Sequence, residues 1–182
     1  MKQQNQQGFT LLEMLGALII IGMMLYALTD VWQQGSRMAE QAQAAWHIKT
    51  VNDATERYIK QNYETLLSSS SASSGPQITI EDLLDADLLP EGFQDSNVWG
   101  QSYEIHIRRP QDNTLSSVIL TTGGREHEEG DSFATLSVPG AALRIGGAGG
   151  FVPTGDMAGQ SADTLHGTAG GYVLDLASIG IA

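Results

Sequence analysis

The sequence has no cysteine and little positive charge. With 0 Cys in 182 residues, disulfide bonds, zinc fingers, iron–sulfur clusters and thiol nucleophiles are excluded. Lys and Arg together number 9 against 21 Asp and Glu, which leaves a formal net charge of −12. Nonspecific nucleic-acid binding needs a basic surface that displaces phosphate counterions, so no nucleic-acid partner is expected.

Apolar residues are concentrated in one stretch near the N-terminus. Between Met14 and Thr29 the chain carries 16 consecutive uncharged residues. Together with residues 9–13 the stretch reaches about 20 residues, the length that crosses a bilayer core. Lys2 is the only basic residue before it. Because basic residues favour the cytoplasmic side of a span, the sequence predicts a single-pass membrane protein with a cytoplasmic N-terminus.

The helical pattern continues beyond the apolar stretch. Residues 33–67 contain one Gly and no Pro and are rich in good helix formers. Their apolar residues recur at spacings that place them on one helical face: Ile48, Val51, Tyr58, Ile59 and Leu66. We therefore expect one long helix over 9–67. Its first part, 9–32, would lie in membrane or against other chains, and its second half would pack on a globular domain.

The remaining residues predict that globular domain. The Ser-rich run 68–77 is typical of a linker, and residues 78–182 follow as the domain. Thr79 and Asp82 form a capping pattern for a short helix, with Pro90 and Gly92 as its stop.

The later part of the domain carries strand signals. Alternating apolar and polar residues predict strands over 102–109, 115–122 and 171–178. Residues 132–145 are compatible with either a strand or a short helix. A long helix followed by a small antiparallel sheet makes the expected fold class α+β.

A specific motif precedes the apolar stretch. A short polar leader ends at Gly8, and Phe9 follows, with Glu13 four positions further on inside the apolar stretch. A secretory signal would instead be cleaved after its apolar segment. A glutamate within a membrane span is costly and is therefore a functional-site hypothesis by default. This combination resembles the type IV pilin class.

The resemblance implies how the chain is processed and assembled. A prepilin peptidase would remove leader 1–8 by cutting between Gly8 and Phe9, and the new amine of Phe9 would be N-methylated. Glu13 would then pair with the Phe9 amine of a neighbouring subunit, because either charge buried alone is costly. The implied fold is the type IV pilin ladle, a long helix packed on a small sheet. The implied partners are other pilin subunits, the peptidase and the inner-membrane assembly machinery, with the mature form in an extracellular pilus.

Phrases further along the chain narrow the resemblance. They are YIKQNYETLL (58–67), the segment from Ile78 to Arg109, VILTTGG (118–124) and GGAGGFV (146–152). They resemble the N-terminal constant region of PilV-type minor pilins, the shufflon pilins of thin conjugative pili. That implies a tip-associated subunit in adhesion and conjugation. In that family a variable C-terminal segment recognises recipient-cell lipopolysaccharide. Such a segment is not evident here, so the chain is expected either to hold only the constant part or to be a shorter relative.

No catalytic or cofactor motif is present, so neither an enzyme nor a cofactor is expected. The acidic residues between 81 and 95 lack the EF-hand pattern and predict a solvated helix face, with a weak calcium site as the alternative. The histidines form no close metal-ligand pair: His47, His106, His127 and His166. Two other functions stay open. One is a type II secretion pseudopilin, which would share everything up to residue 67, and the other is a membrane-anchored periplasmic binding or enzyme domain.

The intact mass of the protein purified from cells tests the processing site. Gly8→Ala should block leader removal and leave the precursor mass, because the predicted cut follows the glycine. The unsubstituted chain should lose residues 1–8 and gain one methyl group, but only in cells that contain a prepilin peptidase. An unsubstituted chain of equal mass with and without the peptidase would contradict the assignment.

Overall fold

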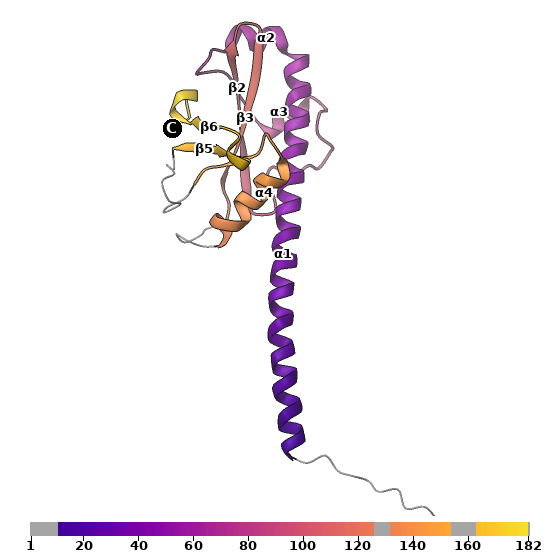
Figure 1. The fold of residues 1–182 in the computed structure, drawn as a ribbon. Coiled ribbons are helices and arrows are strands. Elements are labelled where there is room, and N and C mark those ends of the chain that lie inside the picture. The colour runs from indigo at the N-terminus through magenta and orange to yellow at the C-terminus, as the bar shows by residue number, and fades with distance from the viewer. Residues whose placement is uncertain (1–10, 126–131, 154–162, 182) are drawn as a thin grey trace, which may run out of the picture. The chain divides into compact units, whose positions relative to one another are not determined.

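The computed structural model describes residues 11–125, 132–153 and 163–181 (Figure 1). The chain divides into two units, residues 1–38 and 39–182, and helix α1 (Leu11–Gln61) runs through both. The other elements form two small antiparallel sheets and short helices, so the expected α+β class is confirmed. In chain order they are α2 (Tyr63–Ser69), β1 (Gln77–Ile78), α3 (Ile80–Asp85), β2 (Gln101–Gln111), β3 (Thr114–Gly123), a π-helical turn (Phe133–Ser137), α4 (Val138–Ile145), β4 (Gly150–Phe151), β5 (Thr164–Gly167) and β6 (Val173–Asp175), with 3₁₀ turns at Thr168–Gly170 and Ala177–Ile179.

The long helix does not run unbroken to residue 67. It ends at Gln61, and α2 begins after Asn62, whose backbone leaves the helical region at φ −111° and ψ 22°. The Asn62 side chain donates to the Tyr58 carbonyl at 3.0 Å, a local bond that competes with regular helix geometry. Tyr63 then donates to the carbonyl of Asn113 at 2.7 Å, which fixes α2 over the end of the β2–β3 hairpin.

The main sheet has the order β1-β2-β3, with all pairs antiparallel. Gln111 pairs with Thr114, so only two residues form the hairpin turn, and Asn113 takes the left-handed conformation there at φ 59°. Asn tolerates that conformation better than most residues. The strands expected at 102–109 and 115–122 are confirmed as the cores of β2 and β3.

The third expected strand does not join this sheet. Residues 173–175 form β6, which pairs with β5 in a second three-stranded sheet of order β4-β5-β6. The outer edge of β2 is instead taken by β1, where Ile78 faces Ile105. A two-residue strand is too short to show any alternation, and a strand pattern does not identify its partner. The sequence pattern could therefore predict neither the presence of β1 nor the pairing of β6 with β5.

The core of residues 39–182 lies between α1 and the main sheet. Val51 and Ala54 on α1 are fully buried, as is Ile105 on β2. The other apolar residues of the expected helical face are confirmed as core residues. Ile48, Tyr58 and Ile59 of α1 pack against this core, and Leu66 of α2 is buried. Burying each large aliphatic side chain contributes about 1.5–3 kcal/mol, so this face fixes the second half of α1 on the sheet.

Helix α3 begins as predicted and ends earlier. Thr79 and Asp82 form a capping box, in which the Asp82 amide donates to the Thr79 hydroxyl at 3.1 Å and the Thr79 amide donates to the Asp82 carboxylate at 2.8 Å. The helix stops at Asp85, not at Pro90, because Asp87 turns left-handed at φ 54°. The Leu88 amide then donates back to the Leu83 carbonyl, a bond pattern typical of a helix end.

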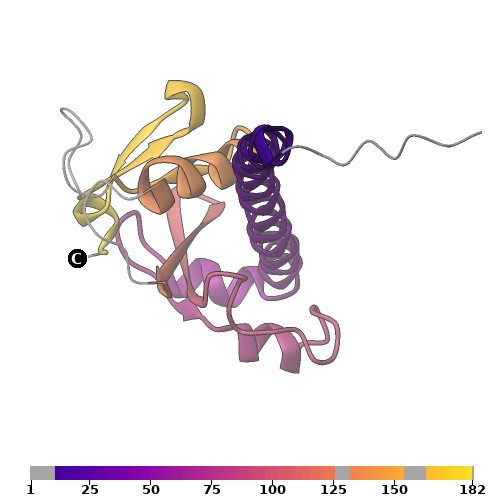
Figure 2. The same ribbon diagram turned by 90° about the horizontal axis from the view of Figure 1, so that it is seen from below.

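For residues 133–145 the structure selects the helical alternative. A π-helical turn leads directly into α4, which carries a Pro in its first turn. Figures 1 and 2 both show α4 beside α1. Gln41 of α1 joins them, since its amide donates to the Leu136 carbonyl at 3.2 Å and its oxygen lies 3.5 Å from Arg144 Nε.

Asn97 organises the turn that leads into β2. Its side-chain oxygen accepts from the amides of Trp99 (2.9 Å) and Gln101 (3.1 Å), and its Nδ2 donates to Gln101 Oε1 at 2.9 Å. Asn97 is buried. The turn holds the Trp99 ring in place. Nε1 of that ring donates to the carboxylate of Glu40 on α1 at 3.2 Å.

Asn97→Ala should lower the free energy of unfolding of residues 39–182 by about 1–3 kcal/mol, because the buried amide of Trp99 and the part-buried amide of Gln101 lose their acceptor. Urea unfolding of the full chain in detergent, followed by tryptophan fluorescence, measures this. Gln94→Ala is the matched control, since the structure gives that exposed side-chain amide one hydrogen bond within the described residues, to the Gly92 carbonyl. Equal losses from the two substitutions would contradict this role of Asn97.

Candidate functional site

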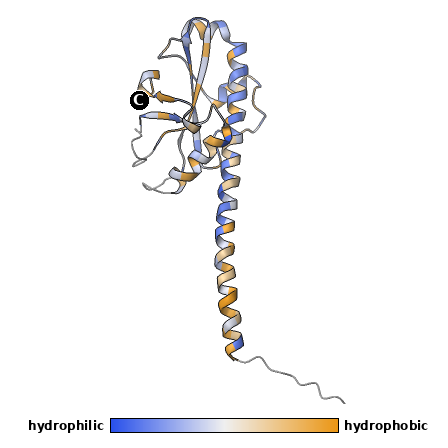
Figure 3. Ribbon diagram, in the orientation of Figure 1, coloured by the Kyte–Doolittle hydropathy of each residue, from blue (hydrophilic) through white to orange (hydrophobic). Residues whose placement is uncertain are grey.

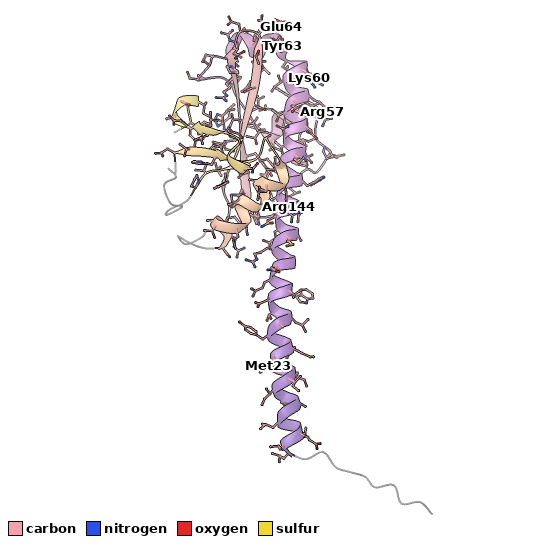
Figure 4. All side chains as sticks on the ribbon, in the orientation of Figure 1. Met23, Arg57, Lys60, Tyr63, Glu64 and Arg144 are labelled. Carbon is pink, nitrogen blue, oxygen red and sulfur yellow. The ribbon has the colours of Figure 1, made fainter. Side chains whose placement is uncertain are left out.

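The part of α1 before Trp32 is mostly apolar, apart from Glu13 and Asp30, and much of its ribbon is orange in Figure 3. Between Leu11 and Trp32 the large apolar side chains are exposed, from 52% for Ile21 to 89% for Leu11, and Met23 stands clear of the helix in Figure 4. By length and composition, α1 is the one helix in the described part of the chain that could cross a membrane. A helix that is apolar all round requires lipid or other chains around it.

The predicted processing and assembly residues lie at the start of this helix. Glu13 is in the first described turn of α1, where its side chain is exposed. Gly8 and Phe9 fall outside the described residues, and with them the predicted cleavage site. A second carboxylate, Asp30, is at the other end of the apolar stretch and is also exposed. The helix thus carries one acidic residue within its apolar part and one at its border.

Metal ligands do not gather in the described ranges. No group of three or more His, Asp or Glu side chains there is placed to hold a metal ion, so the weak calcium site gains no support. The acidic residues from 81 to 95 are all exposed, as expected for a solvated surface. The histidines lie apart: His106 is 3.5 Å from Glu104, His166 is 2.8 Å from Thr164, and His127 lies outside the described residues.

A buried aromatic cluster surrounds the remaining histidine, His47. Its Nδ1 lies 2.6 Å from the hydroxyl of Tyr103, and the two rings stack at 5.4 Å with an interplanar angle of 9°. Phe93 packs on the same imidazole at a centroid distance of 4.3 Å. The sequence pattern assigned no role to His47. Its position four residues before Val51, which places both on one helical face, was the signal that it would be buried.

Burial sets the protonation of this pair. It lowers the pKa of His47 and raises the pKa of Tyr103, because a low-dielectric environment disfavours imidazolium and phenolate. In the neutral tautomer with a bare Nδ1, the imidazole accepts a hydrogen bond from the Tyr103 hydroxyl, and in the other tautomer Nδ1–H donates to the Tyr103 oxygen. The pair is therefore a structural contact between α1 and β2 in which burial favours neutral His47.

The chain matches two protein-family models. Residues 36–182 match the bacterial shufflon protein, N-terminal constant region, and residues 3–28 match the prokaryotic N-terminal methylation motif. Both resemblances seen in the sequence are thereby confirmed.

Individual relatives give the same family. The chain is 27% identical over 124 residues to shufflon protein A′ of Escherichia coli, which covers 67% of this chain and 29% of that protein. Shufflon proteins B and D′ of Escherichia coli match at the same identity, over 28% and 27% of their lengths. The chain thus spans less than a third of the length of these curated relatives. No solved structure matches it.

The stability of residues 39–182 should fall as the pH drops below about 6.5, the pKa of an unperturbed histidine. Because burial lowers the pKa of His47 in the folded chain, the imidazole of the unfolded chain takes up a proton first as the pH falls. The stability that neutral His47 contributes is therefore fully present above about pH 6.5 and is lost progressively below it. Urea midpoints between about pH 5 and pH 8 measure the slope. His47→Gln, which keeps an acceptor and cannot titrate, should flatten it.

The control is His106→Gln, which removes a partly exposed histidine. His47→Gln should flatten the slope more than this control does. If His47→Gln leaves the pH dependence intact, another group causes it and the assignment to His47 is wrong.

Proposed function

The chain belongs to the family of the bacterial shufflon protein N-terminal constant region, and we propose that it is a type IV pilin subunit that polymerises through its N-terminal helix. One observation carries the proposal: a methylation motif over residues 3–28 coincides with an α1 segment that is apolar on every side and uncovered. Such a segment suits a subunit that is anchored first in lipid and later among its neighbours. These matches favour a structural subunit over an enzyme.

The physical basis is the cost of exposing the helix to water. Each large aliphatic side chain loses about 1.5–3 kcal/mol when it leaves an apolar environment, so the segment must be covered at every stage. As a precursor, the chain spans the inner membrane once, with its N-terminus in the cytoplasm. After the peptidase cuts between Gly8 and Phe9 and Phe9 is methylated, residues 9–32 pass from lipid into a bundle of neighbouring helices. The apolar side chains leave lipid for the apolar side chains of neighbouring helices, so the free energy of this transfer is small.

Glu13 gives this bundle its axial register. A carboxylate among apolar helices is costly unless a positive group lies beside it. The amine of Phe9 on an adjacent subunit supplies that group when the two helices are offset by about one turn. Other offsets leave both charges unpaired, so the pair selects one spacing between subunits. The inner-membrane assembly machinery would work against this anchor to draw subunits out of the membrane.

The finer role we propose is that of a minor, tip-associated pilin in adhesion or conjugation. The match over residues 36–182 supports it, because most of that match, residues 68–182, lies beyond the N-terminal part that type II secretion pseudopilins would share. The matched residues correspond to a constant region, so the proposal gives recognition of recipient-cell lipopolysaccharide to a C-terminal segment outside it. No observation in the described residues favours a membrane-anchored enzyme or binding protein.

Glu13→Gln tests the assembly role. It removes the charge at nearly constant size, so leader removal should persist while the yield of sheared pili from cells falls at least tenfold. Asp30→Asn is the matched control on the same helix and should leave the yield within twofold, because that carboxylate lies at the border of the apolar stretch. Both effects are order-of-magnitude expectations for the loss of one buried ion pair.

Two results would contradict the proposal. Normal pili with Glu13→Gln would remove the charge pair from assembly. Processed chain that never leaves the inner membrane, in cells that assemble pili from other subunits, would exclude the pilin function itself.

A further inference from the structure

A small cavity lies on the face of the main sheet that points away from α1. Tyr103, Ile105 and Ile107 of β2 pack in the core against α1, and since side chains alternate along a strand, the residues between them point to the other face. The cavity has a volume of about 90 Å³ and is bordered by residues of that face. Its wall includes Ser73, Ser74, His106, Arg108, Val118 and Gly180. The wall thus combines residues of the sheet with residues from two segments that are distant along the chain.

One wall of the cavity belongs to a Ser-rich segment, residues 71–76, which is bonded to β2 on either side of Arg108. The Arg109 amide donates to the Ser71 carbonyl at 2.8 Å, and the Ile107 amide donates to the Pro76 carbonyl at 3.1 Å. Because both ends of the segment are bonded to β2, the residues between them are held next to Arg108.

Another wall belongs to the 3₁₀ turn at Ala177–Ile179, whose last residue is buried. The Ile181 amide donates to the Leu176 carbonyl at 3.0 Å and closes this turn. Gly180 has a left-handed backbone at φ 76°, and a Cβ on it would lie 2.6 Å from the Ser73 carbonyl oxygen. The turn therefore packs directly on the Ser-rich segment. With both segments fixed in this way, the cavity is already formed, as is usual for a small-ligand site.

Arg108 gives the cavity a positive charge and a free donor. Its Nε is buried and has no hydrogen-bond partner among the described residues, and its guanidinium forms no ion pair within them. A water molecule could accept a hydrogen bond from Nε but would leave the charge without a counterion, whereas an anion supplies both. The N–H groups of a guanidinium are arranged as a fork, so two of them can donate in parallel to two oxygens of one oxyanion.

The other residues around the cavity also favour an anion. Although the chain has 21 Asp and Glu, none of the described residues that border the cavity is acidic. Glu104, two positions before His106, is bonded elsewhere: its carboxylate lies 3.5 Å from His106 Nε2 and accepts from the Thr122 hydroxyl at 3.3 Å. Arg108 also borders a groove of about 550 Å³, but the wall of that groove is mostly apolar and includes Asp53. The small cavity is therefore the one that suits an anion.

We propose that this small cavity binds one small oxyanion, which accepts two hydrogen bonds from the Arg108 guanidinium, with the hydroxyls of Ser73 and Ser74 as further donors. The volume of about 90 Å³ equals roughly three water molecules at about 30 Å³ each. A carboxylate or an inorganic phosphate is of this size, and a nucleotide is not. The bound anion joins the main sheet, the Ser-rich segment and the 3₁₀ turn. This inference is independent of the pilin function.

Urea unfolding of the full chain in detergent, followed by tryptophan fluorescence, tests the proposal. Inorganic phosphate or acetate replaces chloride at constant pH and ionic strength. A ligand that binds only the folded chain raises its stability according to the ligand concentration relative to Kd. At least one of the two oxyanions should therefore raise the urea midpoint, with the onset at a Kd on the order of 1 mM, as expected for one forked Arg–oxyanion pair.

Substitutions and amide exchange locate the site. Arg108→Gln should raise the Kd roughly tenfold or more, and Arg108→Lys should also weaken binding, because an ammonium group lacks the fork. Arg109→Gln is the matched control, since it removes the same charge at the next position, which does not border the cavity, and it should keep the Kd. In the unsubstituted chain, amide exchange should slow at residues 73–75 and 179–180 when the oxyanion binds.

Three results would overturn the proposal. The first is a urea midpoint that rises only in proportion to the salt concentration, as a nonspecific salt effect does, which would leave water as the occupant. The second is an equal Kd for Arg108→Gln and the unsubstituted chain. The third is slowed exchange that is confined to other residues, a result that needs no substitution and so does not depend on a variant that folds.

Discussion

The rest of the structure depends on the contact between one face of α1 and the main sheet. Val51, Ala54 and Thr55 on that face are fully buried, and the hydroxyl of Thr55 donates to the Val51 carbonyl at 2.8 Å, so no polar group on it is left unsatisfied. Opposite them, β2 supplies Ile105 and Ile107. Near residues 11–32 the same helix has no such face, because its apolar side chains lie all round it. The change from one pattern to the other within a single helix separates the part that needs lipid or other chains from the part that holds the globular unit.

Hydrogen bonds from polar side chains also join α1 to the rest of the globular unit, in addition to apolar packing. Arg57 of α1 donates to the Leu88 carbonyl at 3.0 Å, Trp99 donates to Glu40, and Gln41 reaches the carbonyl of Leu136. Each joins α1 to a segment at least 31 residues away, so the loop after α3, the turn before β2 and the π-helical turn before α4 are all positioned from one helix. A single hydrogen bond contributes about 1 kcal/mol, which is modest, but these bonds have defined directions and select one arrangement among many apolar ones.

Two glycines of the second sheet, Gly150 and Gly167, make room for the side chain of Tyr172. A Cβ on Gly167 would lie 2.5 Å from the Tyr172 ring, and one on Gly150 would lie 2.7 Å from the Tyr172 hydroxyl, so the ring packs directly on bare backbone. Tyr172 then donates to the Ala148 carbonyl at 3.0 Å. This arrangement makes the Gly-rich stretch near residues 146–150 part of the wall of a groove of about 550 Å³ beside β3.

The sequence by itself determined the features that depend on local periodicity and local hydrogen bonds. These are the apolar stretch before Trp32, the helical face around Val51, the Thr79–Asp82 cap and the alternation in β2 and β3. The Gly8–Phe9–Glu13 pattern is local in the same way, since it spans only a few residues. Only the tertiary structure decided which strands pair, since β1 is too short for a pattern and β6 bonds to β5 rather than to the main sheet. It alone brought His47 to Tyr103, 56 residues apart, and placed Arg108 in one cavity with Ser74 and Gly180. Such contacts arise from packing between distant segments, and spacing along the chain does not record them.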